Sequence, residues 1–318
     1  MLRATIKFAR VRIVVTCLAL VLLGSIAAGG LALPVVTALL LVVLVNIHAN
    51  SINDYTDRHI DRVNLKGAND RPFVSGTISM LQFWIIHSVS AIAILILSLQ
   101  YELPGIVASL TVLLIDYTYS LRPLRLSDHP LIAPVILSCA YVLYSFTFGF
   151  WSYQGDMVYP VLLVIGLIVG FIARLLLKDF RDIAGDSKYH KTTFLIRFGP
   201  RATVATSGIL FSLAMGIVSW SFGFYLSTTV ALLLCGGMSC WLLWRLFRAD
   251  TFLLQQHCII HIARLANIAI IVIMVYLLCR NQEEIADITR QSIILIIGCV
   301  LSGRVLVNYF LFRPSERT

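Results

Sequence analysis

Apolar runs, each about as long as a membrane-spanning helix, alternate along this chain with short polar segments. A helix that crosses the hydrocarbon core of a bilayer needs roughly 20 mostly apolar residues. Ten runs approach that length, and we expect spans at about residues 12–30, 34–53, 80–99, 103–120, 131–150, 158–178, 203–223, 227–247, 260–279 and 292–312. The pattern predicts an all-α, polytopic transmembrane helical bundle. Nothing between the spans is long enough to form a separate soluble domain.

The composition agrees with lipid as the solvent for most of the chain. Of its 318 residues, 59% are hydrophobic and 13% are charged, against about 25% charged in an average soluble protein. The net charge of +9 does not indicate a nucleic-acid partner, because the basic residues lie between apolar runs, where they set membrane orientation. The seven cysteines are scattered and form no C-x-x-C pair, so we interpret them as small buried hydrophobic residues.

Lys and Arg are distributed very unevenly between the two ends of the expected spans. Of the 25 basic residues, 21 lie on the side that carries both termini and the long loops, and only Arg280 and Arg290 lie in connections on the other side. By the positive-inside rule, both termini and the long loops are cytoplasmic. The first run follows a basic segment, but it lacks a clean cleavage site followed by soluble sequence. We therefore expect an uncleaved first span.

Six of the 16 acidic residues lie in two clusters at the cytoplasmic ends of spans two and six. The first cluster contains Asn53, Asp54, Asp57 and Asp61, and the second contains Asp179, Asp182 and Asp186. At 100° per helical residue, Asn53, Asp57 and Asp61 fall within about 80° of one another, and the second cluster occupies an arc of about 60°. Each cluster is thus expected to share one helix face, and Asn46 and Asn50 extend the first face into the membrane.

Acids at this spacing repel one another, and near the hydrocarbon boundary they need a compensating cation. Mg²⁺ accepts one or two carboxylates from each protein segment and completes its shell with phosphate oxygens. Two facing acidic helices could thus hold a diphosphate through bridging Mg²⁺. The alternative is that these are interfacial acids neutralised by nearby basic residues, which are Arg58, Arg62, Lys178, Arg181 and Lys188. Two clusters on the same side of the membrane favour the metal site.

The two clusters resemble the motifs N-D-x-x-D-x-x-x-D and D-x-x-D-x-x-x-D of the UbiA superfamily of intramembrane prenyltransferases. The segment Arg71-Pro72-Phe73-Val74-Ser75-Gly76 resembles the family's R-P-x-x-S-G, and Tyr119-Ser120 with Pro123-Leu124-Arg125 resembles its Y-S-x-x-P-L-K turn. The similarity covers roughly residues 10 to 280. In two respects the chain departs from the family: it has a tenth expected span where nine are usual, and it has Arg125 in place of Lys.

The resemblance implies a bundle of nine to ten spans with a central cavity, forming a single prenyltransferase domain over 1–318, with motif one at 53–61, motif two at 179–186 and the span at about 292–312 appended. It implies Mg²⁺-dependent transfer of a prenyl group from a prenyl diphosphate to an aromatic or other lipophilic acceptor. We predict Asn53, Asp57, Asp61, Asp179, Asp182 and Asp186 as metal ligands. We predict Asp54, Asp57, Asp182 and Tyr119 as catalytic residues. We predict that the diphosphate is bound by Arg71, Arg122, Arg125, Lys178 and Lys188.

In this mechanism the face of Tyr117, Tyr119 or Tyr141 stabilises an allylic cation. The predicted partners are the prenyl diphosphate donor, the acceptor and membrane lipid, with no nucleic acid, and the predicted location is a bacterial cytoplasmic membrane. No residue selects among phenolic acids, naphthoates, homogentisate, a glyceryl phosphate lipid and the superfamily's other acceptors.

Two other functions remain open from the sequence. A terpene synthase of the same scaffold would act on the prenyl diphosphate without an acceptor. A transporter would use the intramembrane residues Asp116, Arg174 and Arg304 as a polar pathway. His257 and His261, at i and i+4, lack a neighbouring set of carboxylates, so we interpret them as surface or topology residues rather than a metal site.

Overall fold

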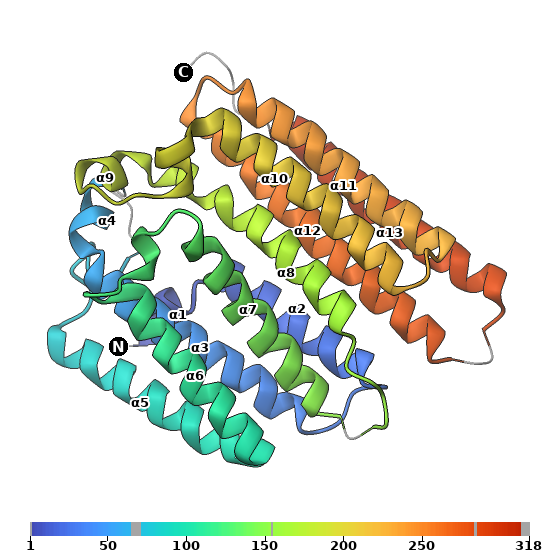
Figure 1. The fold of residues 1–318 in the computed structure, drawn as a ribbon, viewed down its shortest axis with the longest axis horizontal. Coiled ribbons are helices and arrows are strands. Elements are labelled where there is room, and N and C mark those ends of the chain that lie inside the picture. The colour runs from blue at the N-terminus through green and yellow to red at the C-terminus, as the bar shows by residue number, and fades with distance from the viewer. Residues whose placement is uncertain (1, 65–70, 154, 283–284, 313–318) are drawn as a thin grey trace. The chain divides into compact units, whose positions relative to one another are not determined.

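All regular secondary structure in the described part of the chain is helical (Figure 1). The structure is a computed structural model that describes residues 2–64, 71–153, 155–282 and 285–312. Ten of its helices coincide with the predicted spans, namely α2 (Val11–Ala27), α3 (Val35–Thr56), α5 (Met80–Ser98), α6 (Glu102–Ser120), α7 (Ile132–Trp151), α8 (Val161–Leu176), α10 (Phe194–Ser221), α11 (Leu226–Phe247), α12 (Phe252–Arg280) and α13 (Asp287–Leu311). The predicted fold class is confirmed.

Eight stretches of the described chain are long and apolar enough to cross a membrane. One of them, Met80–Ser120, contains both α5 and α6, joined by the short 3₁₀ helix η1 (Leu99–Tyr101). The apolar helix α2 has 17 residues, which at 1.5 Å per residue span about 25 Å, slightly less than the hydrocarbon core of a bilayer. The helices therefore fit the predicted count of nine to ten spans.

Local sequence explains where several helices begin and bend. Ser79 caps α5 in a reciprocal capping box with Gln82. The Thr251 side chain caps α12 by accepting a hydrogen bond from the Leu254 amide, and α12 therefore starts at Phe252, earlier than the apolar run suggested. Helix α10 is interrupted at Gly199, where φ is 80°, next to Pro200. Glycine tolerates this left-handed backbone, and proline cannot continue the preceding helix.

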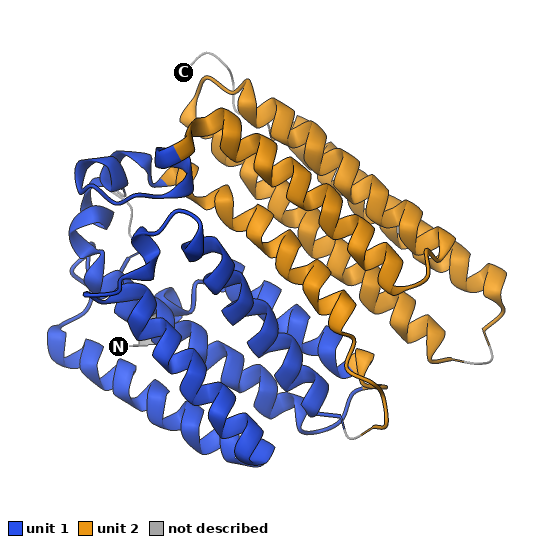
Figure 2. Ribbon diagram, viewed as in Figure 1, with its two compact units in different colours: residues 1–25, 31–154, 182–197 blue, residues 26–30, 155–181, 198–318 orange. Residues whose placement is uncertain are grey.

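The chain divides into two compact units (Figure 2). Unit 1 comprises residues 1–25, 31–154 and 182–197, and unit 2 comprises residues 26–30, 155–181 and 198–318. Unit 1 therefore includes a late segment of the chain, 182–197. The assignment of the whole chain to a single domain stays a prediction.

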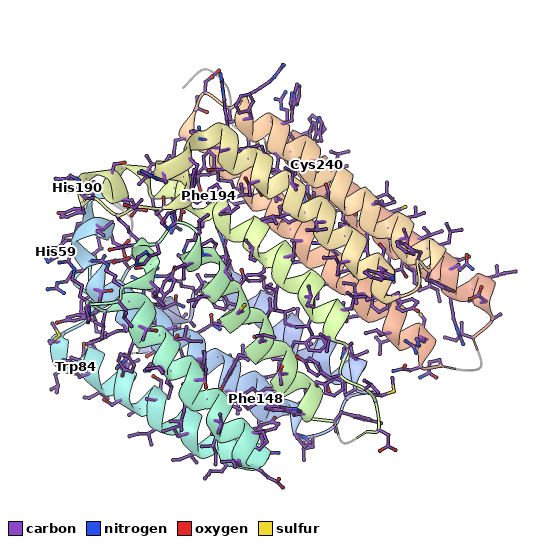
Figure 3. The ribbon with its side chains drawn as sticks, in the orientation of Figure 1. His59, Trp84, Phe148, His190, Phe194 and Cys240 are labelled. Carbon is purple, nitrogen blue, oxygen red and sulfur yellow. The ribbon has the colours of Figure 1, made fainter. Side chains whose placement is uncertain are left out.

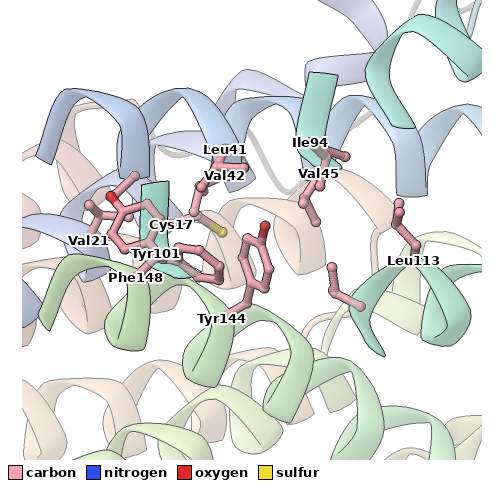
Figure 4. Packing of buried hydrophobic residues seen from close by; sticks show 12 residues of the cluster. Cys17, Val21, Leu41, Val42, Val45, Ile94, Tyr101, Leu113, Tyr144 and Phe148 are labelled. Carbon is pink, nitrogen blue, oxygen red and sulfur yellow. The ribbon is translucent and has the colours of Figure 1, made fainter. Parts of the chain in front are cut away.

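Within unit 1, α3 packs against the short helix α1 (Leu2–Ala9) and against α5, α6 and α7. The buried core of unit 1 contains side chains from α2, α3, α5, α6 and α7, including Cys17, Leu41, Ile94, Leu113 and Phe148 (Figure 4). Helices α2 and α7 meet with their backbones in contact, because Gly24 faces the main chain at Phe146 and Gly149 faces that at Val21. Small residues at such crossings are how membrane helices gain packing energy in lipid.

Within unit 2, α11, α12 and α13 pack against one another. Gly166 of α8 lies against Val218 of α10, and the Ser207 hydroxyl donates to the Ala173 carbonyl at 2.9 Å. The intramembrane residue Arg174 donates to the Asn267 side-chain oxygen at 3.2 Å. This bond gives Arg174 a partner inside the unit, as lipid requires of a charged side chain.

Polar and aromatic side chains join α13, the predicted tenth span, to α12. His257 hydrogen-bonds through Nε2 to the Tyr309 carbonyl at 2.9 Å, and the His257 and Tyr309 rings lie 4.9 Å apart. His261 bonds to the His257 carbonyl and to Arg264. The two histidines therefore serve helix packing, and in the described chain no group of three or more potential ligands includes them.

Candidate functional site

The first acidic cluster lies where α3 ends and the next helix begins. Asn53 and Asp54 belong to the last turns of α3, Asp57 is its C-cap, and Asp61 lies in α4 (Arg58–Asn64). The amide of Asp57 donates to the Asn53 carbonyl at 2.9 Å, and that of Asp61 donates to the Asp57 carbonyl at 2.8 Å. Helical hydrogen bonding thus continues across the junction, which keeps residues four apart on one face.

All three carboxylates of this cluster are buried. Their exposed fractions are 1% for Asp54, 6% for Asp57 and 8% for Asp61. Removing three like charges from water is strongly unfavourable unless each gains a cationic partner. The partners are therefore the central feature of the site.

Four basic side chains from distant parts of the sequence contact these carboxylates. Arg10 and Arg71 both pair with Asp54, Arg71 with an Nη1–Oδ1 distance of 3.2 Å. Arg71 also reaches Asp61, with an Nε–Oδ2 distance of 3.3 Å.

Asp57 is held from two sides. Arg125 donates Nη2–H to Oδ1 at 2.7 Å, and Lys191 donates Nζ–H to Oδ2 at 2.9 Å. Both cations reach the site from short connections rather than from spans: Arg125 precedes the 3₁₀ turn η2 (Leu126–Asp128) with a φ of 34°, and Lys191 follows α9 (Ile183–Lys188). The bidentate use of Asp57 by two cations fixes the carboxylate plane.

The second acidic cluster is not one continuous helix. Asp179 lies in the 3₁₀ helix η3 (Lys178–Arg181), Asp182 is the N-cap of α9 with φ −105° and ψ 5°, and Asp186 lies inside α9. The helical arc expected from spacing alone is broken at Asp182. Asp179 belongs to unit 2, whereas Asp182 and Asp186 belong to unit 1.

Within unit 1, the end of the second cluster packs against the end of the first. Helix α9 contacts α4, and the Gly185 amide donates to the Asn64 side-chain oxygen. A Cβ at position 185 would lie 2.6 Å from that oxygen, so only glycine fits this approach without movement. In Figure 3 the labelled side chain of His59 shows the position of α4, and that of His190, two residues after α9, shows the position of α9.

Lys191 connects the two clusters electrostatically. Burial opposes its charge, but Asp57 and Asp186 more than compensate, so the pKa of Lys191 lies above its usual value. The Arg10 guanidinium is half-buried, and Asp54 beside it raises its pKa. Both side chains therefore stay cationic in their half-buried positions.

Burial destabilises the charged form of Asp61. Burial raises the pKa of Asp61 to about 6, with Arg71 partly opposing this and the nearby charges of Asp54 and Asp57 adding to it. A carboxylate with a raised pKa gains most from an additional cation.

The donor set of the cluster suits a hard divalent cation. The neighbouring groups are carboxylates and the Asn53 amide, all oxygen ligands of the kind that Mg²⁺ prefers. Asp54 Oδ2 is buried without a hydrogen-bond partner among the described residues, so one acceptor is left for a further cation. No group of three His, Cys, Asp or Glu residues in the described ranges is already arranged around one metal position.

The other predicted site residues lie at different places. Tyr119 is buried near the end of α6. Arg122, Lys178 and Lys188 are exposed, and Lys188 lies with Nζ 5.9 Å from the Tyr189 ring centroid.

Sequence reasoning assigned Arg10 only to membrane orientation and left Lys191 out of the predicted site. Their positions gave no local signal, because they pair with residues 44 and 134 positions away. For Lys191, its place directly after the second cluster was the one available hint.

Known proteins resemble this chain in sequence and in fold. The UbiA prenyltransferase family model matches residues 13–257. A digeranylgeranylglyceryl phosphate synthase of Methanospirillum hungatei is 33% identical over 217 residues, covering 64% of this chain and 74% of that protein. The 33 kDa chain of bacteriochlorophyll synthase from Rhodobacter capsulatus is 27% identical over 208 residues, covering 61% of this chain and 67% of that protein.

Solved structures share the fold at low sequence identity. A UbiA homologue from Archaeoglobus fulgidus bound to DMAPP and Mg²⁺ covers 97% of this chain and 100% of its own at 15% identity, with a TM-score of 0.58. A structure of digeranylgeranylglyceryl phosphate synthase covers 86% of this chain and 97% of its own at 20% identity, with a TM-score of 0.64. Together with the spans, these likenesses identify an integral membrane prenyltransferase. The chain belongs to the UbiA prenyltransferase family.

Proposed function

We propose that this protein transfers a prenyl group from a prenyl diphosphate to a lipophilic acceptor, in a Mg²⁺-dependent reaction that releases diphosphate. The observation that carries this proposal is the buried group of Asp54, Asp57 and Asp61, surrounded by four cations and packed against the end of the second acidic cluster. Such a group holds both signs of charge that a metal–diphosphate complex requires.

The residues that would hold Mg²⁺ are Asn53, Asp57, Asp61, Asp179, Asp182 and Asp186, and Asp54 has the unsatisfied oxygen. Bound Mg²⁺ supplies neutralisation of the diphosphate oxygens, which makes diphosphate a better leaving group. The ion pairs hold the carboxylates of Asp54, Asp57 and Asp61 in fixed positions before loading, so these ligands are already oriented.

Arg71, Arg125, Arg10 and Lys191 have a second task in this proposal. In the metal-free site they neutralise carboxylates, and on loading they turn to the diphosphate oxygens and stabilise the charge that develops as the C–O bond breaks. The exposed Arg122, Lys178 and Lys188 would contribute to the capture of the donor by long-range attraction.

In this proposal Tyr119 would face the allylic centre that remains after diphosphate departs. It is buried at the end of α6, and an aromatic face stabilises a carbocation through its quadrupole. Asp182, half-buried at the start of α9, and Asp54 would orient the reacting groups.

The acceptor proposed for first trial is a glyceryl phosphate lipid. The support is the similarity to digeranylgeranylglyceryl phosphate synthases from several organisms, and aromatic acceptors follow in the trial. We also propose that the acidic ends of α3 and η3 face the cytoplasm, because 21 of the 25 basic residues lie at the same end of the expected spans as these acids. A bacterial cytoplasmic membrane stays a prediction, since the similar proteins come from Methanospirillum as well as Rhodobacter.

The test uses purified protein in lipid nanodiscs with Mg²⁺, radiolabelled geranylgeranyl diphosphate and each acceptor in turn: geranylgeranylglyceryl phosphate, 4-hydroxybenzoate, dihydroxynaphthoate and homogentisate. We expect Mg²⁺-dependent diphosphate release and a prenylated product with one acceptor. Asp57→Ala should abolish release, whereas Asp156→Ala, an exposed carboxylate in a connection, should not. Unchanged release by Asp57→Ala would refute the proposed site, and release without any acceptor would favour a terpene synthase.

A further inference from the structure

A second group of buried polar side chains lies in the spans of unit 1, below the acidic cluster. It consists of the buried residues His48 and Ser51 on α3, His87 on α5 and Asp116 on α6, with Tyr117 of α6, which is 37% exposed, at its edge. His48 is six residues before Asp54 on α3, which is about 9 Å along the helix axis. No residue of this group was assigned a role in binding the donor.

His48 and Asp116 form the centre of the group. His48 Nδ1 lies 2.8 Å from Asp116 Oδ2, and the exposed fractions of the two residues are 0% and 7%. When Asp116 is ionised, Nδ1 must donate its proton to the carboxylate. This arrangement leaves the lone pair of Nε2 as the basic position and stabilises an imidazolium once Nε2 takes a proton.

His48 Nε2 is the decisive atom. It is buried and has no hydrogen-bond partner among the described residues. A buried polar atom without a hydrogen-bond partner costs about 1–3 kcal/mol. Ionisable side chains inside a membrane span usually have a function in binding, transport or catalysis. The free lone pair therefore indicates a position for a proton donor that arrives with a substrate.

The surrounding side chains hold the pair in place. The His87 ring stacks on His48 with centroids 4.1 Å apart, and it bonds to Ser51 at 2.9 Å and to the Tyr117 hydroxyl at 2.8 Å. With both of its nitrogens occupied, His87 has no free basic atom. It fixes the orientation of His48 rather than competing for the same proton.

Charge interactions extend from the pair toward the acidic cluster. Tyr141 of α7 interacts electrostatically with Asp116, with Tyr119 and with Arg10. Arg10 is in turn an ion-pair partner of Asp54. The pair therefore lies within electrostatic range of groups that also interact with the acidic cluster.

We propose that His48 and Asp116 form the proton-accepting pair for the acceptor substrate. This proposal rests on the proposed function and names the step that it leaves open. As the acceptor oxygen forms its bond to C1 of the prenyl group, the C1–O bond to diphosphate breaks and its electron pair leaves with diphosphate. The acceptor's hydroxyl proton passes to His48 Nε2, and Asp116 carries the compensating negative charge.

The pair would select acceptors that present a hydroxyl at this depth in the membrane. Water is a poor competitor there, because the group lies within the expected spans and His48, Ser51, His87 and Asp116 are buried. The prenyl cation is then captured by the acceptor rather than by solvent. Loss of the base should therefore shift the products from prenylated acceptor toward prenyl alcohol.

The experiment compares wild type with His48→Gln, Asp116→Asn and Asp116→Glu in nanodiscs. Each protein receives Mg²⁺, geranylgeranyl diphosphate and the acceptor panel named above, and diphosphate, prenyl alcohol and prenylated product are quantified. Tyr144→Phe is the control, because it removes a buried hydrogen bond between α6 and α7, to Ser109 at 3.1 Å, without an acid or a base.

We expect His48→Gln and Asp116→Asn to lower transfer at saturating acceptor by about 100-fold, the lower range for loss of a general base. Donor affinity and diphosphate release should stay within threefold of wild type, and prenyl alcohol should rise. Asp116→Glu should recover part of the transfer, and Tyr144→Phe should resemble wild type.

Three results would overturn the proposal. Wild-type transfer by His48→Gln would show that no proton is accepted there, and an equal loss of diphosphate release and transfer would show that the group only holds the helices together. Diphosphate release by wild type with no acceptor prenylated would leave the pair without a substrate to deprotonate. In contrast, absence of Mg²⁺-dependent diphosphate release by wild type would refute the proposed function itself.

Discussion

Gly185 offers a sharp test of how the two acidic clusters are joined. The change Gly185→Ala adds a Cβ that would lie 2.6–2.7 Å from three side-chain atoms of Asn64. Either α9 moves away from α4, or the Asn64 side chain rotates and gives up its bond from the Gly185 amide. Both responses weaken the packing that brings Asp186 and Lys191 toward Asp57.

The size of the effect follows from those two responses. Rotation of Asn64 loses one hydrogen bond, about 1 kcal/mol, and leaves a buried amide unsatisfied. Movement of α9 avoids that loss but costs roughly 1–3 kcal/mol of overpacking. The protein adopts the response with the lower free-energy cost, and we expect that cost to be about 2 kcal/mol. If the same free energy is lost from donor binding, the affinity for the donor falls about 30-fold.

The assay is equilibrium binding of radiolabelled geranylgeranyl diphosphate with Mg²⁺ in nanodiscs. Gly216→Ala is the matched control, since a Cβ there meets nothing within 4 Å. Asn64→Ala should remove the collision, so the double variant should bind better than Gly185→Ala alone. Donor affinity within twofold of wild type for Gly185→Ala would refute the view that docking of α9 on α4 assembles the site.

Three further predictions concern charge and packing. The pKa of Asp61 in the folded protein, about 6, exceeds its value in the unfolded chain, so the contribution of Asp61 to stability falls as the pH rises from about 4 to 6. Asp61→Asn should therefore raise the unfolding temperature of the metal-free protein more at pH 7 than at pH 4. An equal increase at both pH values would contradict this. Arg125→Ala removes a charge-assisted bond to Asp57 of 2.7 Å and should weaken donor affinity about tenfold, where an unchanged dissociation constant would count against the role of Arg125. Gly149→Val forces α7 away from the Val21 carbonyl and should cost about 3 kcal/mol of stability, measured as a lower unfolding temperature; a wild-type value would show that the helices can separate freely.

Local sequence predicted the elements well and the long-range partners poorly. Apolar runs located the ten longer helices, because in lipid a span must satisfy its own backbone and its length is set by the bilayer. The first acidic cluster kept its common face through Asp57, as its spacing indicated. The second did not, because Asp182 ends a 3₁₀ turn and starts a new helix, and tertiary packing rather than spacing decides such a break.

The partners of the acids required the fold. Arg71 and Arg125 were predicted to bind diphosphate rather than the acids, and Arg10 and Lys191 looked like topology residues, since the connections on the expected cytoplasmic side are basic. From the sequence, Asp116 was assigned only to the polar pathway of the alternative transporter, and its bond to His48 joins residues 68 positions apart. Spacing reveals neighbours within a helix, whereas these pairs arise only when α3, α6 and the connections meet.

The late segment 182–197 has a consequence for biosynthesis. It completes a unit whose other parts end at residue 154, so a nascent chain that has emerged only to that point holds Asp57 without Lys191. At roughly 5–20 residues per second, translation needs a few more seconds to supply the missing lysine. Until Lys191 is made, the buried group of three aspartates lacks one of its four cationic partners. An N-terminal fragment that ends at residue 154 would lack this partner permanently.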